Sequence, residues 1–168
     1  MPDKTHVKAV VVCGLMIAAA MICSYLESFI PIGLPGVKPG LANLVVLDCI
    51  WLMDPLWVVM IMTVRIVLSG FMFSGMSAML YSLAGGIVSL TVMLIAKKHT
   101  KLSMLGVSIM GGVSHNIAQL IVAASVVRTL AVLSYLPVLL TAGAVAGTIV
   151  GLAGRQILPL LKKSGIDF

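Results

Sequence analysis

The chain is a series of six apolar runs separated by short polar turns, and this pattern restricts it to very few folds. The runs cover about residues 7–30, 41–53, 56–73, 76–96, 102–127 and 135–161. About 20 apolar helical residues cross a bilayer core of about 30 Å, so every run except the second is long enough to span it. Hydrophobic residues make up 61% of the sequence, far more than in soluble domains. We therefore expect an all-α integral membrane protein with six transmembrane helices in a single domain, residues 1–168.

The second run differs from the others because it is short. The loop before it, residues 31–40, holds three prolines and three glycines and cannot continue a helix. Asp54-Pro55 ends the run and can begin the next helix, with Asp54 as N-cap and Pro55 in the first turn. This segment is expected to be tilted, shortened or partly re-entrant, and whether it crosses the membrane fully stays open.

Basic residues are distributed unevenly between the two sides that an even number of spans defines. Loops on the cytoplasmic side of bacterial membrane proteins are rich in lysine and arginine. One side collects seven lysines, whereas the other holds only Lys38 and Arg128. The distribution places both termini in the cytoplasm of a multi-pass protein of the bacterial cytoplasmic membrane. The seven are Lys4, Lys8, Lys97, Lys98, Lys101, Lys162 and Lys163.

The lack of clustered acidic residues and of paired cysteines excludes several classes of function. The net charge of +6 comes from these lysine tufts, so it indicates topology and not nucleic-acid binding. Only five acidic residues are present, and no aspartate-rich motif could hold magnesium on a diphosphate, so we expect no prenyl-synthase catalysis. The three cysteines lie in apolar runs without CxxC spacing, which argues against a metal site, a disulfide or a covalent cofactor.

Polar side chains inside the apolar runs are the candidate functional residues. Each costs a few kcal/mol in lipid unless it is paired or faces a wet cavity. The fifth run carries a stripe of such positions on one helix face, at steps of three and four residues. It could contact a ligand or form hydrogen bonds between helices. The stripe consists of Ser108, Gly112, His115 and Gln119, with Asn116 at its edge.

Arg65 lies near the centre of the third run and keeps its charge at any accessible pH. Asp48 is the nearest acidic residue by depth, so we expect a structural Asp48–Arg65 ion pair. The alternative is that Arg65 pairs with an anionic group of a ligand. On the outer side, Glu27 and Lys38 either close the first loop over a cavity or lie in the headgroup zone.

Two tracks of small residues predict close helix packing. Gly143, Gly147 and Gly151 form a GxxxGxxxG ridge on the sixth run, and Gly14 and Ala18 form a similar track on the first. Small residues let helix backbones approach in lipid, where little hydrophobic force drives association. Spacing does not tell an internal helix from another protein as the partner. Intramolecular packing is commoner, so we expect it for the sixth run, whereas both possibilities stay open for the first.

Four stretches, in order along the chain, resemble one known family. They are Ser24–Pro31 (SYLESFIP), Pro35–Asn43 (PGVKPGLAN), Leu80–Gly86 (LYSLAGG) and Ser114–Gln119 (SHNIAQ). The family is known as Gx transporter or heptaprenyl diphosphate synthase component I, and the resemblance extends from about Val10 to Leu160. It is in turn similar to the substrate-binding S-components of energy-coupling factor transporters.

The resemblance implies a six-helix protein that binds a vitamin-like molecule near the outer face and docks on a transmembrane coupling protein. Gly14 and Ala18 would form part of that docking surface. The chain has no phosphate-binding loop, so separate ATPase subunits would supply the energy. Some family members look similar to a membrane component of flavin-based extracellular electron transfer systems. For such a protein, a noncovalently bound flavin or quinone and a membrane redox partner are implied.

The first functional hypothesis is therefore a substrate-binding membrane protein for uptake of a small vitamin-like or isoprenoid-related molecule, and not an enzyme. The alternative is a membrane subunit of a flavin- or quinone-linked electron transfer system. A third possibility, a simple anchor in the lipid bilayer for a soluble partner, predicts no cavity. The expected ligand contacts are His115, Asn116, Gln119, Arg65, Tyr81, Glu27, Asn43 and Lys38.

Overall fold

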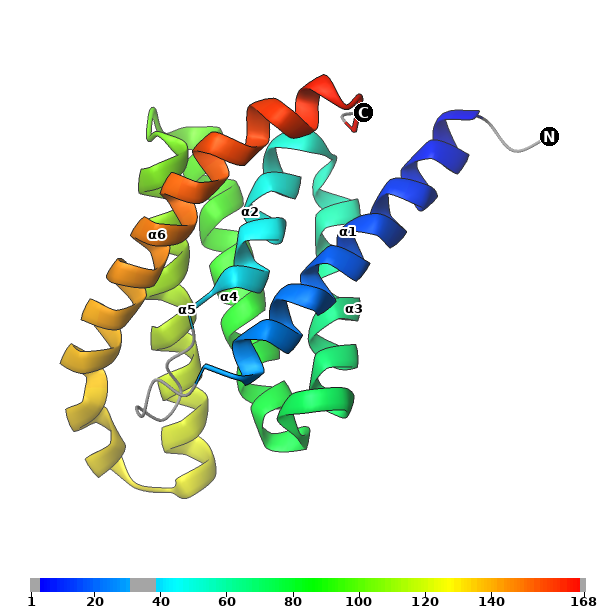
Figure 1. Ribbon diagram of the computed structural model, residues 1–168. Coiled ribbons are helices and arrows are strands. Elements are labelled where there is room, and N and C mark those ends of the chain that lie inside the picture. The colour runs from blue at the N-terminus through cyan, green and yellow to red at the C-terminus, as the bar shows by residue number, and fades with distance from the viewer. Residues whose placement is uncertain (1–3, 31–38, 167–168) are drawn as a thin grey trace.

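The structure is a computed structural model that describes residues 4–30 and 39–166. Over these residues it is a bundle of six α-helices without strands (Figure 1), which confirms the predicted all-α class. A short π-helix (η1, Gly70–Ser74) and a short 3-10 helix (η2, Leu130–Tyr135) precede α4 and α6. The α-helices are α1 (Lys4–Ser28), α2 (Leu41–Leu52), α3 (Pro55–Ser69), α4 (Met76–His99), α5 (Met104–Val127) and α6 (Leu136–Lys163).

Helix length separates α2 from the rest of the bundle. Among the described residues, five helices are long and apolar enough to cross a membrane, counting η1 with α3 and η2 with α6. Helix α2 has 12 residues and is about 18 Å long at 1.5 Å per residue. Large apolar side chains elsewhere face outward, among them Val11 at 65% exposure and Phe71 at 68%. Such surfaces are stable in contact with lipid, and the chain is a multi-pass membrane protein.

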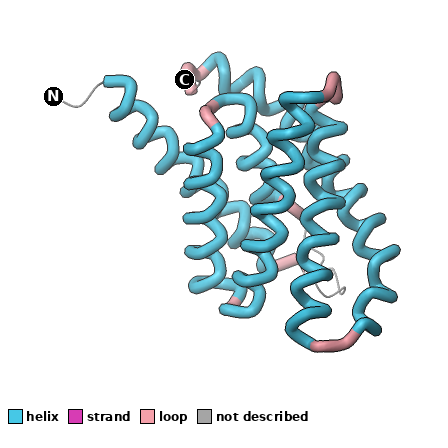
Figure 2. The backbone as a smooth tube through the Cα atoms, turned by 180° about the vertical axis from the view of Figure 1, so that it is seen from behind, coloured by secondary structure: helices cyan, strands magenta, loops and turns pink. Residues whose placement is uncertain are grey.

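Successive helices run in opposite directions, and the described ends of the chain lie at the same end of the bundle (Figure 1). Helix α5 packs between α4 and α6, while α2 packs against α1, α3 and α6. The turn between α5 and α6 lies at the opposite end (Figure 2). The side chains of Leu47, Ile50, Ile61 and Val107 are almost completely buried and fill the centre.

The glycine ridge of α6 packs against α5, so the predicted contact is intramolecular. A Cβ atom on Gly147 would lie 2.7 Å from both the Ile109 Cα and the Ser108 carbonyl oxygen, closer than real Cβ atoms approach. The Ser108 hydroxyl donates a hydrogen bond of 2.7 Å to the Gly147 carbonyl. In contrast, a Cβ on Gly14 would meet nothing within 4 Å among the described residues, and Ala18 is exposed.

The connection between α3 and α4 includes the π-helical turn η1. The amide of Gly75 donates to the Gly70 carbonyl at 2.8 Å, which closes the π-helical turn η1. Gly75 has φ 83° and ψ 164°, a backbone conformation that is essentially restricted to glycine because it has no Cβ. π-Helical turns are frequent at functional sites. This one carries Ser74, which lines a cavity inside the bundle.

The basic end of α4 holds the C-terminal end of α2. The Lys97 ammonium donates a 2.5 Å hydrogen bond to the Ile50 carbonyl and lies 5.3 Å from the centre of the Trp51 ring. A cation at this position also complements the helix dipole. Pro55 occupies the first turn of α3 as expected, but the Asp54 side chain makes no capping hydrogen bond.

The lysines at the ends of α4 and α6 lie at the same end of the bundle as the described chain ends (Figure 1). With the positive-inside rule, we expect this end to face the cytoplasm. Alkaline phosphatase inserted after Thr129, between α5 and η2, should be active, whereas the same enzyme fused after Lys163 should be inactive. An active fusion after Lys163 would contradict the assigned orientation.

Candidate ligand-binding site

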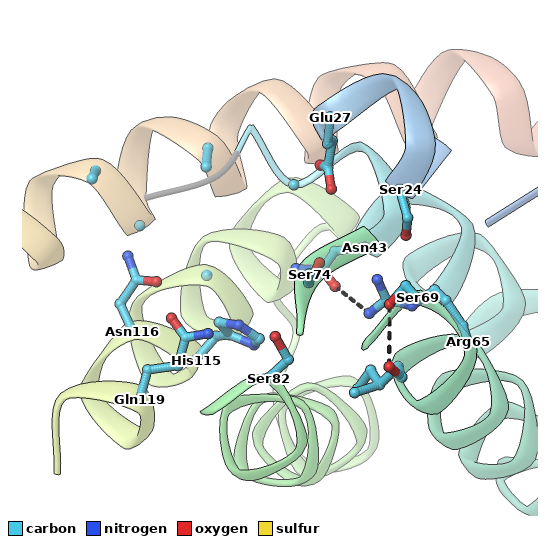
Figure 3. Close-up of a pocket in the computed structure, with 16 residues that line it drawn as sticks. Ser24, Glu27, Asn43, Arg65, Ser69, Ser74, Ser82, His115, Asn116 and Gln119 are labelled. Atoms are coloured by element: carbon cyan, nitrogen blue, oxygen red, sulfur yellow. Dashed lines mark hydrogen bonds between the residues drawn. The ribbon is translucent and has the colours of Figure 1, made fainter. Parts of the chain in front are cut away.

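A polar cavity, here called the polar chamber, lies inside the bundle (Figure 3). Its lining residues near the ends of α1 and α3 and the starts of α2 and α4 place it toward the end opposite the described chain ends. Its volume is about 80 Å³. A water needs roughly 10–15 Å³ of such space, so the chamber can hold several waters or one small polar group. All six α-helices contribute lining residues. The polar ones are Ser24, Glu27, Asn43, Arg65, Ser69, Ser74, Ser82, His115, Asn116 and Gln119.

Arg65 provides the cation of the chamber and is only 8% exposed. Its Nη2 donates a 3.0 Å hydrogen bond to Asn43 Oδ1 (Figure 3). Its Nε is buried and has no hydrogen-bond partner among the described residues. The Glu27 side chain points toward the chamber from α1 and interacts electrostatically with Arg65. The guanidinium is thus held in place with one donor still available.

The expected Asp48–Arg65 ion pair is a prediction that the structure corrects. Asn43 and Arg65 each lie eleven residues from Asp54, so the turn between α2 and α3 brings them to the same depth. Asp48 is five positions from Asn43, about 140° around the helix, and therefore faces elsewhere. It is buried beside Gly154 of α6, and its Oδ1 has no hydrogen-bond partner among the described residues. Depth in the membrane alone predicts Asp48 as the partner of Arg65, but this prediction is wrong because it does not consider which face of α2 each residue lies on.

The stripe on α5 serves both purposes that the sequence left open. His115, Asn116 and Gln119 line the chamber. The Asn116 side-chain amide also donates a buried 2.7 Å hydrogen bond to the Leu139 carbonyl of α6. Ser108, nearer the start of α5, bonds to α6 and does not line the chamber. Part of the stripe therefore fastens two helices, and part is directed at the cavity.

Gly85 of α4 makes room for the His115 ring. A Cβ on Gly85 would lie 2.8–2.9 Å from three atoms of the imidazole, so a larger residue would displace it. This explains the glycine in the Leu80–Gly86 stretch in physical terms. No sequence pattern indicates this contact, because it joins two helices whose relative rotation only the fold defines.

The remaining predicted contacts fall into three groups. Glu27 and Asn43 line the polar chamber, whereas Tyr81 lines a neighbouring hollow, and Lys38 lies outside the described residues. Sequence reasoning did not select Ser24, Ser74 or Ser82 as contacts. Ser24 and Ser82 belong to the stretches that carry the family resemblance, which was a usable signal. Gly143, predicted only for helix packing, also lines the chamber.

The neighbouring hollow, here called the apolar groove, lies between α4, α5 and η2 and has a volume of about 810 Å³. Small and apolar side chains make up most of its wall. Ser74, Ser82 and Gln119 line both the groove and the polar chamber, so the two hollows adjoin. The other residues lining the groove are Ser77, Ala78, Tyr81, Leu120, Ala123, Ala131, Val132, Ser134, Tyr135 and Leu139.

The chain matches a known protein family over most of its length. The model of the family described as heptaprenyl diphosphate synthase component I matches residues 16–157. The chain belongs to this family. No curated protein and no solved structure matches the chain significantly.

The component I family takes its name from a prenyl synthase, a class of enzyme that usually needs acidic clusters for magnesium. In the part of the chain that the structure describes, no three His, Cys, Asp or Glu side chains gather in a way that could hold a metal ion. The chamber instead offers one guanidinium, one carboxylate, an imidazole, amides and hydroxyls. This set suits recognition of a polar group by hydrogen bonds.

Proposed function

We propose that this component I family member is a substrate-binding membrane protein of the S-component type. It binds a small vitamin-like or isoprenoid-related molecule for uptake, with a polar group of that molecule in the polar chamber. The proposal rests on one observation: residues from all six α-helices, polar ones from five of them, converge on a single cavity inside an apolar bundle. Polar groups at this depth are costly unless they serve each other or a ligand.

Capture begins on the outer side in this proposal, because the chamber lies toward the end that carries fewer lysines. A coupling protein with separate ATPase subunits then supplies the energy. The exposed Gly14 and Ala18 on α1 are the proposed docking positions for that partner. In this proposal the chain itself performs no prenyl transfer.

Native mass spectrometry of the full chain purified in mild detergent tests the proposal. We expect a small molecule to remain bound to the wild-type protein. Replacement of His115 by Ala should lower its occupancy about two- to tenfold, the usual effect of losing one hydrogen bond. His99→Ala is the matched control, because His99 is exposed at the end of α4 and should change nothing.

Two outcomes would contradict the proposal. A wild-type protein that carries no small molecule would favour a simple membrane anchor. A bound flavin or quinone that a membrane NADH dehydrogenase reduces in place would favour the electron transfer role over uptake.

A further inference from the structure

We propose that the ligand of this protein is amphipathic, with an uncharged or singly charged head that offers acceptor oxygens and an apolar body. The oxygen-bearing edge of the head enters the polar chamber, whose volume of about 80 Å³ admits a small polar group, and the rest of the molecule lies in the apolar groove. This inference rests on the proposed binding function and names the chemical class of the ligand.

The continuity of the two hollows supports one elongated ligand over two separate ones. Ser74 of η1, Ser82 of α4 and Gln119 of α5 line both spaces and form the boundary between them. Polarity changes sharply across this boundary. On one side lie Arg65, Glu27 and His115, and on the other most side chains are alanine, leucine, valine or tyrosine. A molecule that crosses the boundary must therefore be polar at one end and apolar at the other.

The chamber requires acceptor atoms on the head. Arg65 Nε is a buried donor without a hydrogen-bond partner among the described residues, and leaving such a donor unsatisfied costs about 1–3 kcal/mol. Helix α2 begins beside the chamber at Gly40 and directs the positive end of its dipole there. Carbonyl, hydroxyl or carboxylate oxygens satisfy both features.

The same charges disfavour a diphosphate head. Among the described residues lining the chamber, Arg65 is the one arginine or lysine, and it already donates to Asn43 and interacts with Glu27. A diphosphate would bring two or more negative charges next to the Glu27 carboxylate in a poorly solvated space. Unpaired charges there cost several kcal/mol each. The expected head therefore carries at most one charge.

The groove has the size and lining for an apolar body. Its volume of about 810 Å³ is within the range of roughly 300–1,000 Å³ typical of small-molecule sites. The small side chains of Ala78, Ala123 and Ala131 leave space inside the groove. The rings of Tyr81 and Tyr135 provide flat surfaces that an apolar body can contact. Because the groove is open to the outside of the bundle, a chain can enter it from the lipid side.

Three probes separate head from body: dimethylnaphthoquinone (head alone), methyl geranyl naphthoquinone (head and apolar body), and geranyl diphosphate (the same body with a highly charged head). Binding to the full chain is measured by native mass spectrometry and by the shift in melting temperature. We expect the geranylated quinone to bind at least about tenfold more tightly than the quinone alone. Geranyl diphosphate should bind more weakly than the geranylated quinone.

Variants of α5 locate the body. Ala123→Trp puts an indole into the groove and should weaken binding of the geranylated quinone about tenfold or more, with the quinone alone unaffected. Ala124→Trp is the matched control, because Ala124 is the next residue on the same helix, is similarly half-buried and does not line the groove. Partition of the probe into the micelle is the same for both variants, so the difference between them reports the groove.

The inference fails if the geranylated quinone does not bind, or if Ala123→Trp and Ala124→Trp affect it equally, which would mean that lipid alone fills the groove. Tighter binding of geranyl diphosphate would overturn the assignment of the head. Each of these results leaves the proposed function standing if wild-type protein still carries a small molecule that His115→Ala releases. If wild-type protein carries no small molecule and His115→Ala changes nothing, the proposed function is rejected as well.

Discussion

Replacement of Gly147 by Val should destabilise the protein by on the order of 3 kcal/mol, the upper part of the usual range for overpacking. The Cβ at this position would lie 2.7 Å from the Ile109 Cα and the Ser108 carbonyl oxygen, which are backbone atoms that no change of rotamer can move. Helices α5 and α6 must therefore separate, and the buried bond from Ser108 to the Gly147 carbonyl is strained or lost. Thermal or denaturant unfolding in detergent measures the effect.

Gly14→Val on α1 is the control for this experiment. It makes the same chemical change in a transmembrane helix, but its Cβ would meet nothing within 4 Å among the described residues. The expected change is within about 0.5 kcal/mol. Equal losses from the two variants would mean that helix propensity, and not the contact between α5 and α6, determines the result.

Replacement of Arg65 by Met should reduce ligand occupancy about 10- to 100-fold. Hydrogen bonds to a charged group contribute roughly 1.5–3 kcal/mol, and the guanidinium is the buried cation next to the chamber. The variant should still fold, because methionine fills similar volume and removes a charge that is expensive to bury. Native mass spectrometry gives the occupancy, and the melting temperature of the ligand-free protein reports folding.

Two further substitutions interpret that result. Arg155→Met removes an exposed arginine of α6 and should leave occupancy unchanged. Arg65→Lys keeps the positive charge but not the planar guanidinium. The lysine ammonium should contact either Asn43 or the ligand but not both, so we expect an occupancy between those of the wild type and Arg65→Met. Full occupancy in Arg65→Met would show that the guanidinium only fastens α2 to α3.

The helices could be predicted from the sequence because lipid imposes a simple rule of length and apolarity. The short second run and the break at Asp54-Pro55 correspond to α2 and its turn into α3. The turn at Gly75 followed from its place between two apolar runs. These features depend on the chain alone and not on its packing.

The site was less predictable because it depends on how the helices are rotated about their axes. The sequence indicates that Arg65 needs a partner, and depth alone predicts Asp48, whereas Asn43 has both the depth and the helix face. Tyr81 and Ser82 are neighbours on α4, yet Tyr81 lines the groove and Ser82 also reaches the chamber. Whether two adjacent residues line the same hollow depends on how their helix is rotated about its axis, and no local sequence pattern specifies that rotation.

Helix α2 also connects two distant regions mechanically. Asn43 in its first turn bonds to Arg65, while Ile50 and Trp51 at its other end contact Lys97. A short helix behaves as a stiff rod, so a ligand that displaces Asn43 along the axis moves Trp51 by about the same amount. Under the proposed uptake function, helix α2 therefore couples occupancy of the polar chamber to the end of the bundle where the described chain ends lie.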